Sequence, residues 1–323
     1  MQVIVLSEFG PPGVLVPATA DDPVPGPGQV VIAVEFANVT FVETQLRAGR
    51  APFPMPADAL PMVPGNGVGG TVAAVGPGVD ETWLGRRVVS GTGGSGGYAE
   101  RVAVAASGLI EIPAGVATDD AVALLADGRT AGALVRAATL RAGDWVLVEA
   151  AGGGVGTVLT QLCVLAGARV IGAARGADKL RLARELGAEQ AVDYAEPGWA
   201  KRVRAGADGV EVVFDGVGGS IAAEAFELLG PGGRMLSYGL ASGSFAEIPD
   251  DAAIARGVTL IRGVPVSPAE AVGLTRAALT EAAAGRLRPV IGQRFPLADA
   301  AAAHAAIESR STIGKTLLVV GSA

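Results

Sequence analysis

The chain has 323 residues, of which 50% are hydrophobic and 18% are charged, so its length favours two domains and its composition supports a packed core. Its net charge is −7 at pH 7, and such a surface repels phosphate backbones, which argues against nucleic acid as a main partner. With one cysteine and one histidine, the chain cannot form an intramolecular disulfide, and a zinc site of the usual Cys/His kind is excluded.

No segment has the pattern of a signal peptide or a membrane anchor. The first residues lack a basic region and meet an acid and prolines early. The uncharged window 150–168 is long enough to cross a bilayer, but it contains five glycines and directly follows a strand pattern. We therefore expect a cytoplasmic protein that does not span a membrane.

Residues 1–117 have a β-rich pattern. Glycine and proline turns separate short runs of strand type, and the proline-rich residues 50–64 predict an irregular loop. The strands are expected at 30–36, 70–75, 87–90 and 98–104.

The periodicity changes near Thr118. Residues 119–140 predict a helix that is interrupted at 127–129, and strands then alternate with helices as far as residue 262. Such an alternation predicts a Rossmann domain over 118–262, in which helices cover both faces of a parallel sheet. The strands are expected at 146–149, 170–173, 191–193, 212–214, 234–238 and 259–262, and the helices at 157–166, 179–186 and 221–229.

Residues 263–323 form a C-terminal segment with no core of its own. Two helices, at 268–284 and 298–309, and a strand at 316–320 are expected there. We expect this segment to pack on the β-rich N-terminal domain. The fold class is therefore α/β, with a parallel Rossmann sheet beside a β-rich catalytic domain.

A glycine-dense turn follows the strand that begins near Trp145. The turn contains Gly152, Gly153, Gly154, Val155 and Gly156, and an apolar run of helix type comes next. Glycines allow the backbone to turn sharply and to approach a pyrophosphate, and the N-terminus of the helix offers free N–H groups and a positive dipole end. The pattern predicts cofactor binding by Gly153, Gly154, Val155 and Gly156.

The tip of the next strand indicates which dinucleotide binds. A Rossmann strand for NAD ends with an acid about 20 residues beyond the glycine turn, whereas this strand ends at Ala174 and Arg175. Arg175 and Lys179 place two cations where an adenosine 2′-phosphate would lie, and Tyr194 can add a hydroxyl. We interpret Asp178 as a cap of the following helix. NADPH is the predicted cofactor, with ordinary surface cations as the alternative interpretation.

The segment 143–161 resembles the signature of the zinc-independent quinone oxidoreductase branch of the medium-chain dehydrogenase/reductase superfamily. It reads G-D-x-x-L-x-x-x-A-G-G-G-x-G-x-x-x-x-Q, and Val164 then stands where a basic residue or serine is usual. The resemblance covers almost the whole chain. Further matching segments are 37–49, 64–67, 96–100, 215–219, 238–239, 308–310 and 314–315.

This resemblance implies a GroES-like N-terminal domain, completed by the tail, and a cofactor in a cleft between the domains. Lys179, Tyr194 and Arg310 match positions that help to hold NADPH. Thr130 matches a turn that approaches the nicotinamide, and Val217 is a further expected cofactor contact. In zinc-dependent relatives a cysteine would fall near Thr40 and a His-Glu pair at 66–67, and all three are missing here.

Without zinc, hydride delivery suits an acceptor that is already electrophilic, such as a quinone, an enone or an enoyl thioester. The candidate substrate contacts are Thr40, Gln45 and Arg129. Many relatives carry asparagine near Thr40, aspartate near Glu43 and tyrosine near Gln45, and this chain differs at all three. Arg129 is expected either to bind an anionic group of substrate or cofactor, or to pair with Asp127. The other polar candidates are expected to be structural, namely Tyr98, Cys163 and His304.

The predicted function is an NADPH-dependent reductase of quinones or activated C=C bonds. Two alternatives stay open: an enoyl reductase of a biosynthetic, polyketide-type intermediate, and a catalytically silent NADPH-binding protein. The resemblance also implies a homodimer, in which two exposed edge strands at 259–262 would pair across a two-fold axis.

Overall fold

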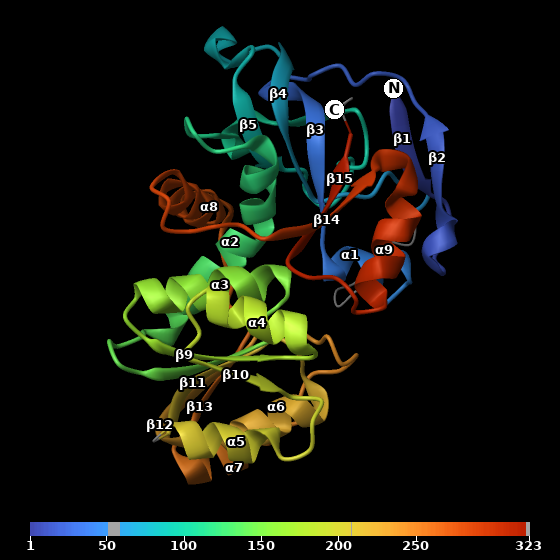
Figure 1. Cartoon of the computed structure of the whole chain (residues 1–323). Coiled ribbons are helices and arrows are strands. Elements are labelled where there is room, and N and C mark those ends of the chain that lie inside the picture. The colour runs from blue at the N-terminus through green and yellow to red at the C-terminus, as the bar shows by residue number, and fades with distance from the viewer. Residues whose placement is uncertain (51–58, 208, 321–323) are drawn as a thin grey trace. The chain divides into compact units, whose positions relative to one another are not determined.

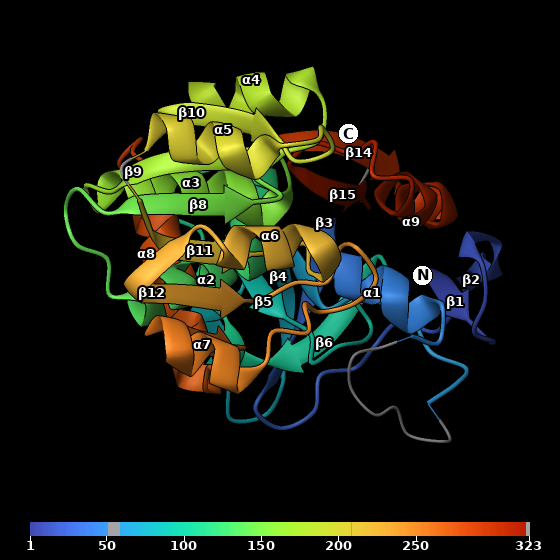
Figure 2. The same cartoon turned by 90° about the horizontal axis from the view of Figure 1, so that it is seen from below.

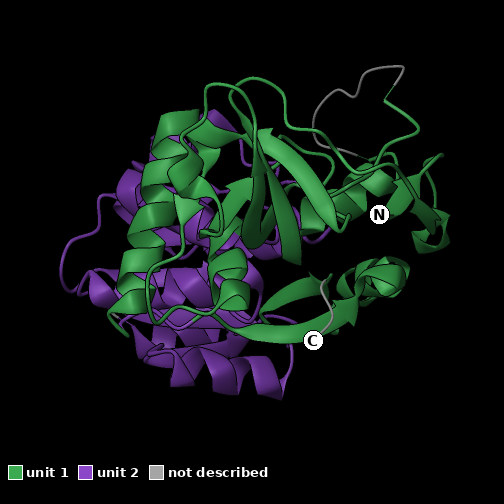
Figure 3. Cartoon of the chain, turned by 90° about the horizontal axis from the view of Figure 1, so that it is seen from above, with its two compact units in different colours: residues 1–126, 268–285, 289–323 green, residues 127–267, 286–288 purple. Residues whose placement is uncertain are grey.

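The computed structural model describes residues 1–50, 59–207 and 209–320. It divides into two compact units, which Figure 3 colours separately. Unit 1 comprises residues 1–126, 268–285 and 289–323, and unit 2 comprises residues 127–267 and 286–288. Of the predicted loop at 50–64, residues 51–58 lie outside the described residues. Within the described part of the chain, no helix has both the length and the apolar run that crossing a bilayer requires.

Unit 1 is built from antiparallel strands and from the tail. Its described strands form a two-stranded sheet, β1-β2, and a seven-stranded sheet in the order β14-β15-β3-β4-β5-β7, with β6 also paired to β3. The strands are β1 (Gln2–Leu6), β2 (Leu15–Thr19), β3 (Gln29–Val39), β4 (Gly67–Val75), β5 (Arg87–Gly91), β6 (Arg101–Ala105), β7 (Ile110–Glu111), β14 (Ile291–Pro296) and β15 (Lys315–Val319). The helices are α1 (Phe41–Arg47), α8 (Pro268–Ala283) and α9 (Ala300–Glu308), with 3₁₀ turns at Pro12–Val14, Glu81–Trp83, Ala106–Gly108 and Leu297–Asp299.

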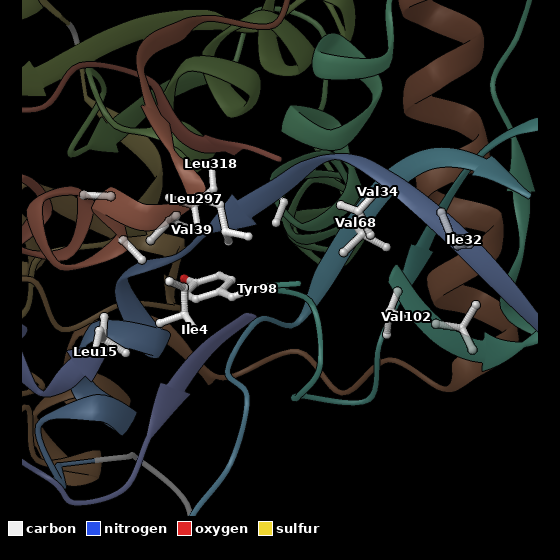
Figure 4. Close-up of a cluster of buried hydrophobic side chains, with 14 of the residues drawn as sticks. Ile4, Leu15, Ile32, Val34, Val39, Val68, Tyr98, Val102, Leu297 and Leu318 are labelled. Atoms are coloured by element: carbon white, nitrogen blue, oxygen red, sulfur yellow. The ribbon is translucent and has the colours of Figure 1, made fainter. Parts of the chain in front are cut away.

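The long strand β3 organises this unit, because it pairs antiparallel with β4, β6 and β15. Its residues Val30, Ile32 and Val34 follow the two-residue period of a strand and are buried on one face, and Val31 is buried as well, so the other face is also covered there. Figure 4 shows this core, in which Ile4 from β1 and Leu318 from β15 lie around Tyr98. The tail thus adds two strands, β14 and β15, and buried side chains to the sheet of the N-terminal residues.

Unit 2 contains a parallel sheet whose described strands run in the order β10-β9-β8-β11-β12-β13. Helices α3 and α4 cover one face of this sheet, and α5, α6 and α7 cover the other (Figures 1 and 2). The strands are β8 (Trp145–Glu149), β9 (Arg169–Ala174), β10 (Gln190–Asp193), β11 (Val210–Asp215), β12 (Leu229–Ser237) and β13 (Thr259–Arg262). The helices are α3 (Gly154–Leu165), α4 (Ala177–Glu185), α5 (Trp199–Gly206), α6 (Gly219–Phe226) and α7 (Asp250–Arg256).

This strand order is that of a doubly wound dinucleotide-binding sheet, so the predicted α/β class is confirmed. The chain leaves β8 toward β9 on one side and returns at β11 on the other side. The direction of winding therefore reverses at the carboxyl ends of β8 and β11, which is where such sheets bind ligands. The glycine turn directly follows β8 at this edge.

Several predicted elements differ from those observed. Helix α2 (Thr118–Ala138) runs unbroken through Asp127 and Gly128, so the predicted interruption is wrong. Both residues are buried, and packing of this kind overrides the weak helix propensity of glycine. Helix α6 ends at Phe226 because β12 begins at Leu229, three residues later. The sequence analysis missed β1, β2, β7, α1, α5, α7 and β14.

Candidate cofactor site

The turn between β8 and α3 has the geometry of an anion-binding helix terminus. Gly153 is the N-cap of α3 and supplies no side-chain cap, with φ −89° and ψ 174°. The first helical hydrogen bond runs from the Thr157 N–H to the Gly153 carbonyl. The N–H groups of Gly154, Val155 and Gly156 come before it, so they have no acceptor within the helix. A pyrophosphate oxygen is the acceptor that such a terminus favours.

Three glycines of this turn are in contacts that leave no room for a side chain. A Cβ on Gly156 would lie 2.2 Å from the Ala150 carbonyl oxygen, and one on Gly154 would lie 2.2 Å from Asp127 Oδ2. A Cβ on Gly152 would lie 2.6 Å from Cγ of Lys179. The turn therefore packs tightly against the Ala150 backbone, the Asp127 carboxylate and the side chain of Lys179. The sequence predicted the turn, but not that Asp127 lies beside it.

The cations expected at the tip of β9 are brought together. Arg175 directly follows β9 and is exposed, and Lys179 is half-buried in the first turn of α4. Burial lowers the pKa of Lys179, and the charge of Arg175 lowers it further. Tyr194 joins them at the same edge of the sheet, because its N–H donates to the Ala174 carbonyl over 3.3 Å. A phosphate beside Lys179 would favour its charged form, which burial and the neighbouring cation disfavour.

The nearest strand-end carboxylate is already engaged by the backbone. Asp193, the last residue of β10, accepts from the N–H groups of Gly176 and Ala195, each at 2.8 Å. The expected cap at Asp178 is wrong, because the N-cap of α4 is Gly176 and the Asp178 carboxylate lies 3.4 Å from the Arg181 guanidinium. These contacts fit NADPH, which needs cations rather than a free acid at this strand tip.

A second turn at the same edge is shaped by Asp215, the last residue of β11. Its Oδ1 accepts from the N–H of Val217 at 3.1 Å and from the N–H of Gly218 at 2.7 Å. Gly218 has φ +75°, a conformation that glycine adopts without strain. Val217 is thereby fixed just beyond β11 and is 3% exposed.

In unit 1, the candidate substrate residues Thr40 and Gln45 are each hydrogen-bonded to other side chains of the segment 40–50. Thr40 caps α1: its hydroxyl donates to Glu43 Oε2 over 2.9 Å and accepts from the Glu43 N–H over 3.3 Å. Burial raises the pKa of Glu43, and the bonds from Thr40 oppose that rise. Gln45 donates to the Thr44 hydroxyl and accepts from Arg50 Nε. The Thr40 hydroxyl therefore already donates its proton to Glu43, a partner that the sequence analysis did not assign.

Arg129 and Arg310 lie in different units, Arg129 in α2 within unit 2 and Arg310 beyond α9 in unit 1. No described residue forms an ion pair or hydrogen bond with the Arg129 guanidinium, so pairing with Asp127 is not observed. Thr130 follows Arg129 in α2 and is partly buried, and Arg310 is exposed with φ +59°. An anionic group remains the expected partner of Arg129.

A zinc ion does not fit the side chains of this chain. In the described residues, no three His, Cys, Asp or Glu side chains gather where they could hold a metal ion. Cys163 is buried in α3, where burial raises the pKa of its thiol, and His304 is hydrogen-bonded to Tyr98 over 3.0 Å. Thr40 and Asn66 stand where metal ligands would be expected.

Comparisons with known proteins match both units. The family model "Alcohol dehydrogenase GroES-like domain" matches residues 26–114, and "Zinc-binding dehydrogenase" matches residues 154–272. The chain is 32% identical to the quinone oxidoreductase of Pseudomonas aeruginosa over 324 residues, covering 98% of each. It is 32% identical to the 2-haloacrylate reductase of a Burkholderia species, covering 91% of this chain and 92% of the relative. A mycobacterial protein solved in complex with NADPH superposes with a TM-score of 0.89 at 36% identity, covering 99% of this chain and 100% of the other.

Proposed function

The chain belongs to the zinc-independent quinone oxidoreductase branch of the medium-chain dehydrogenase/reductase superfamily, and on that premise we propose that it reduces quinones or activated C=C bonds with NADPH. The observation that carries this proposal is the end-to-end match with quinone oxidoreductases. The matched relative that reduces 2-haloacrylate supports an acceptor with an electron-poor C=C bond.

Each predicted cofactor residue has a proposed task. The N–H groups of Gly154, Val155 and Gly156 bind the pyrophosphate at the positive end of α3. The Gly153 N–H donates to the Ala150 carbonyl over 2.8 Å, so Gly153 contributes by letting the backbone approach the pyrophosphate closely. Arg175, Lys179 and Tyr194 hold the 2′-phosphate, with Arg310 as a further cation. Thr130 and Val217 bind the nicotinamide part. Bound NADPH supplies the hydride, so the chain's task is to orient the acceptor and to exclude water.

The substrate contacts proposed are Thr40, Gln45 and Arg129. Arg129 supports an acceptor with an anionic group, because its guanidinium has no partner among the described residues. The Gln45 amide can donate toward a developing oxyanion, whereas the Thr40 hydroxyl already donates to Glu43. Reduction of a quinone needs no further acid from the chain, because solvent can protonate the product.

We propose that residues 1–117 with 263–323 are the catalytic domain and that residues 118–262 are the cofactor domain. We propose also a cytoplasmic homodimer. Strand β13 supports the dimer, since it is the last strand on its side of the sheet in unit 2 and its residues are partly or fully exposed. Light scattering tests the dimer by measuring the mass of the protein in solution, and the mass of a monomer would refute it.

The activity is tested by following NADPH absorbance with quinones, simple enones and an enoyl thioester, with NADH in parallel. Turnover of a quinone or enone with NADPH preferred supports the proposal. Turnover of the thioester alone favours the enoyl reductase, for which Arg129 and the altered residues 40–45 are the motivating features. Tight NADPH binding without turnover of any acceptor would favour the catalytically silent protein.

Replacing Lys179 by alanine is expected to weaken NADPH binding by about 1.5–3 kcal/mol, the range of a hydrogen bond to a charged group. Binding of NADH is expected to change little, because it lacks the 2′-phosphate. Titration of the cofactor fluorescence measures both dissociation constants. Arg181→Ala is the control, since Arg181 lies on the same helix but pairs with Glu185. An equal loss of affinity for both cofactors would contradict the assignment.

A further inference from the structure

Two carboxyl groups lie side by side under the two turns of unit 2. Strands β8 and β11 pair in parallel with Phe214 opposite Val148, so the next residues, Asp215 and Glu149, occupy adjacent strand ends. Both are 0% exposed, and residues at matching positions of adjacent strands point to the same face of a sheet. Glu149 immediately precedes the glycine turn, and Asp215 immediately precedes the turn that contains Val217.

The hydrogen bonds of this pair are incomplete if both groups are ionised. Asp215 Oδ1 accepts two backbone N–H groups, but Asp215 Oδ2 and both oxygens of Glu149 receive no hydrogen bond from the described residues. Three buried acceptors without a donor would be costly. One proton placed between the two carboxyl groups supplies a donor and removes one of the two adjacent negative charges.

Among the described residues, the groups that act on Glu149 supply no compensating positive charge. The Tyr238 hydroxyl donates to the backbone carbonyl of Glu149 over 3.4 Å, and the other ionisable groups that act on Tyr238 are Asp215, Asp127 and Tyr194. All of these are acids. Burial raises the pKa of Glu149 well above its ordinary value, the charge of Asp215 raises it further, and the Val217 N–H opposes the rise.

We propose that Glu149 is a positioning residue that stays protonated at neutral pH and donates a hydrogen bond to the Asp215 carboxylate. Asp215, carrying a single charge, then holds the Val217 turn in place for the cofactor. Glu149 thus acts on NADPH through Asp215, and this role rests on the function proposed above. Ionisation of Glu149 would break the shared hydrogen bond and put a second negative charge beside the turn that binds the pyrophosphate.

The proton is tested without cofactor or substrate by infrared spectroscopy of the free protein at pH 7. A protonated carboxyl group absorbs apart from carboxylates, and its band is expected in the wild type and is expected to be smaller in Glu149→Gln. Glu224→Gln, an exposed position on α6 in the same unit, should leave the band unchanged. Glu43, Asp127 and Asp215 are also buried carboxyl groups, so it is the loss between wild type and Glu149→Gln that counts. A spectrum without this loss would overturn the proposal.

The positioning role is tested by the pH dependence of NADPH binding. Between neutral and alkaline pH, the wild-type dissociation constant is expected to rise about tenfold more than that of Glu149→Gln, since an added nearby charge contributes on the order of one pKa unit. Lys179 is present in both proteins, and burial raises the pKa of Tyr238 so far that this group stays protonated in both, so neither accounts for a difference between them. Glutamine can still donate to Asp215, so affinity at pH 7 should be kept. Curves of dissociation constant against pH that run parallel in wild type and Glu149→Gln would overturn the positioning role. If the protein reduces no acceptor but the infrared band still decreases in Glu149→Gln, only the proposed function is refuted.

Discussion

Replacing Gly156 by alanine is expected to weaken NADPH binding by about 100-fold or more, the scale expected when binding groups are displaced by about 1 Å. The added Cβ would lie 2.2 Å from the Ala150 carbonyl oxygen and 2.9 Å from the Ala150 carbonyl carbon. These are backbone atoms, so no side chain can rotate away, and the turn itself must open. The N–H groups at the start of α3 then no longer converge on the pyrophosphate. Titration of NADPH fluorescence measures the loss.

Gly153→Ala is the matched control in the same turn. A Cβ there would lie 3.3 Å from the nearest atom, and the backbone of Gly153 already has a conformation open to any residue. We expect this variant to lose only a few-fold in affinity. Overpacking at Gly156 should also cost about 1–3 kcal/mol of stability, so thermal unfolding must show that both variants are folded. Wild-type affinity in a folded Gly156→Ala protein would contradict the assignment of this turn.

The glycine turn could be predicted because its signal is local. A strand, a cluster of glycines and an apolar helix follow one another within residues 145–165, and each supports the interpretation of the others. The cations at the tip of β9 could be predicted for the same reason, since Arg175 and Lys179 are close in sequence. The parallel sheet followed from the alternation of elements.

The partners of these residues could not be predicted, because they come from distant parts of the chain. Asp127 lies against Gly154 only because α2 continues unbroken, and the sequence had suggested a break at that residue. Glu149 and Asp215 meet only through the register of β8 with β11. A single sequence does not give the register between strands, so a buried acid pair of this kind has no local signature.

Helix α1 was missed although a local signal was present. Thr40 and Glu43 form a capping box, the Thr-x-x-Glu pattern that marks the start of a helix. In the sequence analysis, Thr40 and Glu43 appear only as positions near the candidate substrate contacts where the chain differs from many relatives. In the hydrogen bonds between these two residues, the Thr40 hydroxyl donates its proton to Glu43, which composition and resemblance did not reveal.

The single histidine is expected to make unit 1 sensitive to acid. His304 is 0% exposed on α9, where Nε2 is hydrogen-bonded to the Tyr98 hydroxyl and Nδ1 has no partner among the described residues. Burial, and to a smaller extent the charge of Arg47, lower its pKa to about 3. The tail helix is therefore docked through a neutral imidazole.

The direction of the pH effect follows from this depressed pKa. Between pH 6.5 and 3, His304 binds a proton in the unfolded chain but not in the folded chain. The contribution of His304 to the free energy of unfolding is therefore complete above pH 6.5 and decreases as the pH falls. Each pH unit is worth about 1.4 kcal/mol, so about 3 kcal/mol is lost by about pH 4. Urea unfolding of the wild type at several pH values measures the total change in the free energy of unfolding, to which the carboxyl groups also contribute.

His304→Gln isolates the contribution of the histidine, because glutamine can keep a hydrogen bond to Tyr98 but does not titrate. The free energies of unfolding of wild type and variant should converge by about 3 kcal/mol between neutral pH and about pH 4. Since the chain has one histidine, the NMR signal of its ring reports the proton directly and should not shift above about pH 4 in the folded protein. A ring that titrates near pH 6.5, with parallel stability curves, would mean that the docked helix leaves His304 open to water.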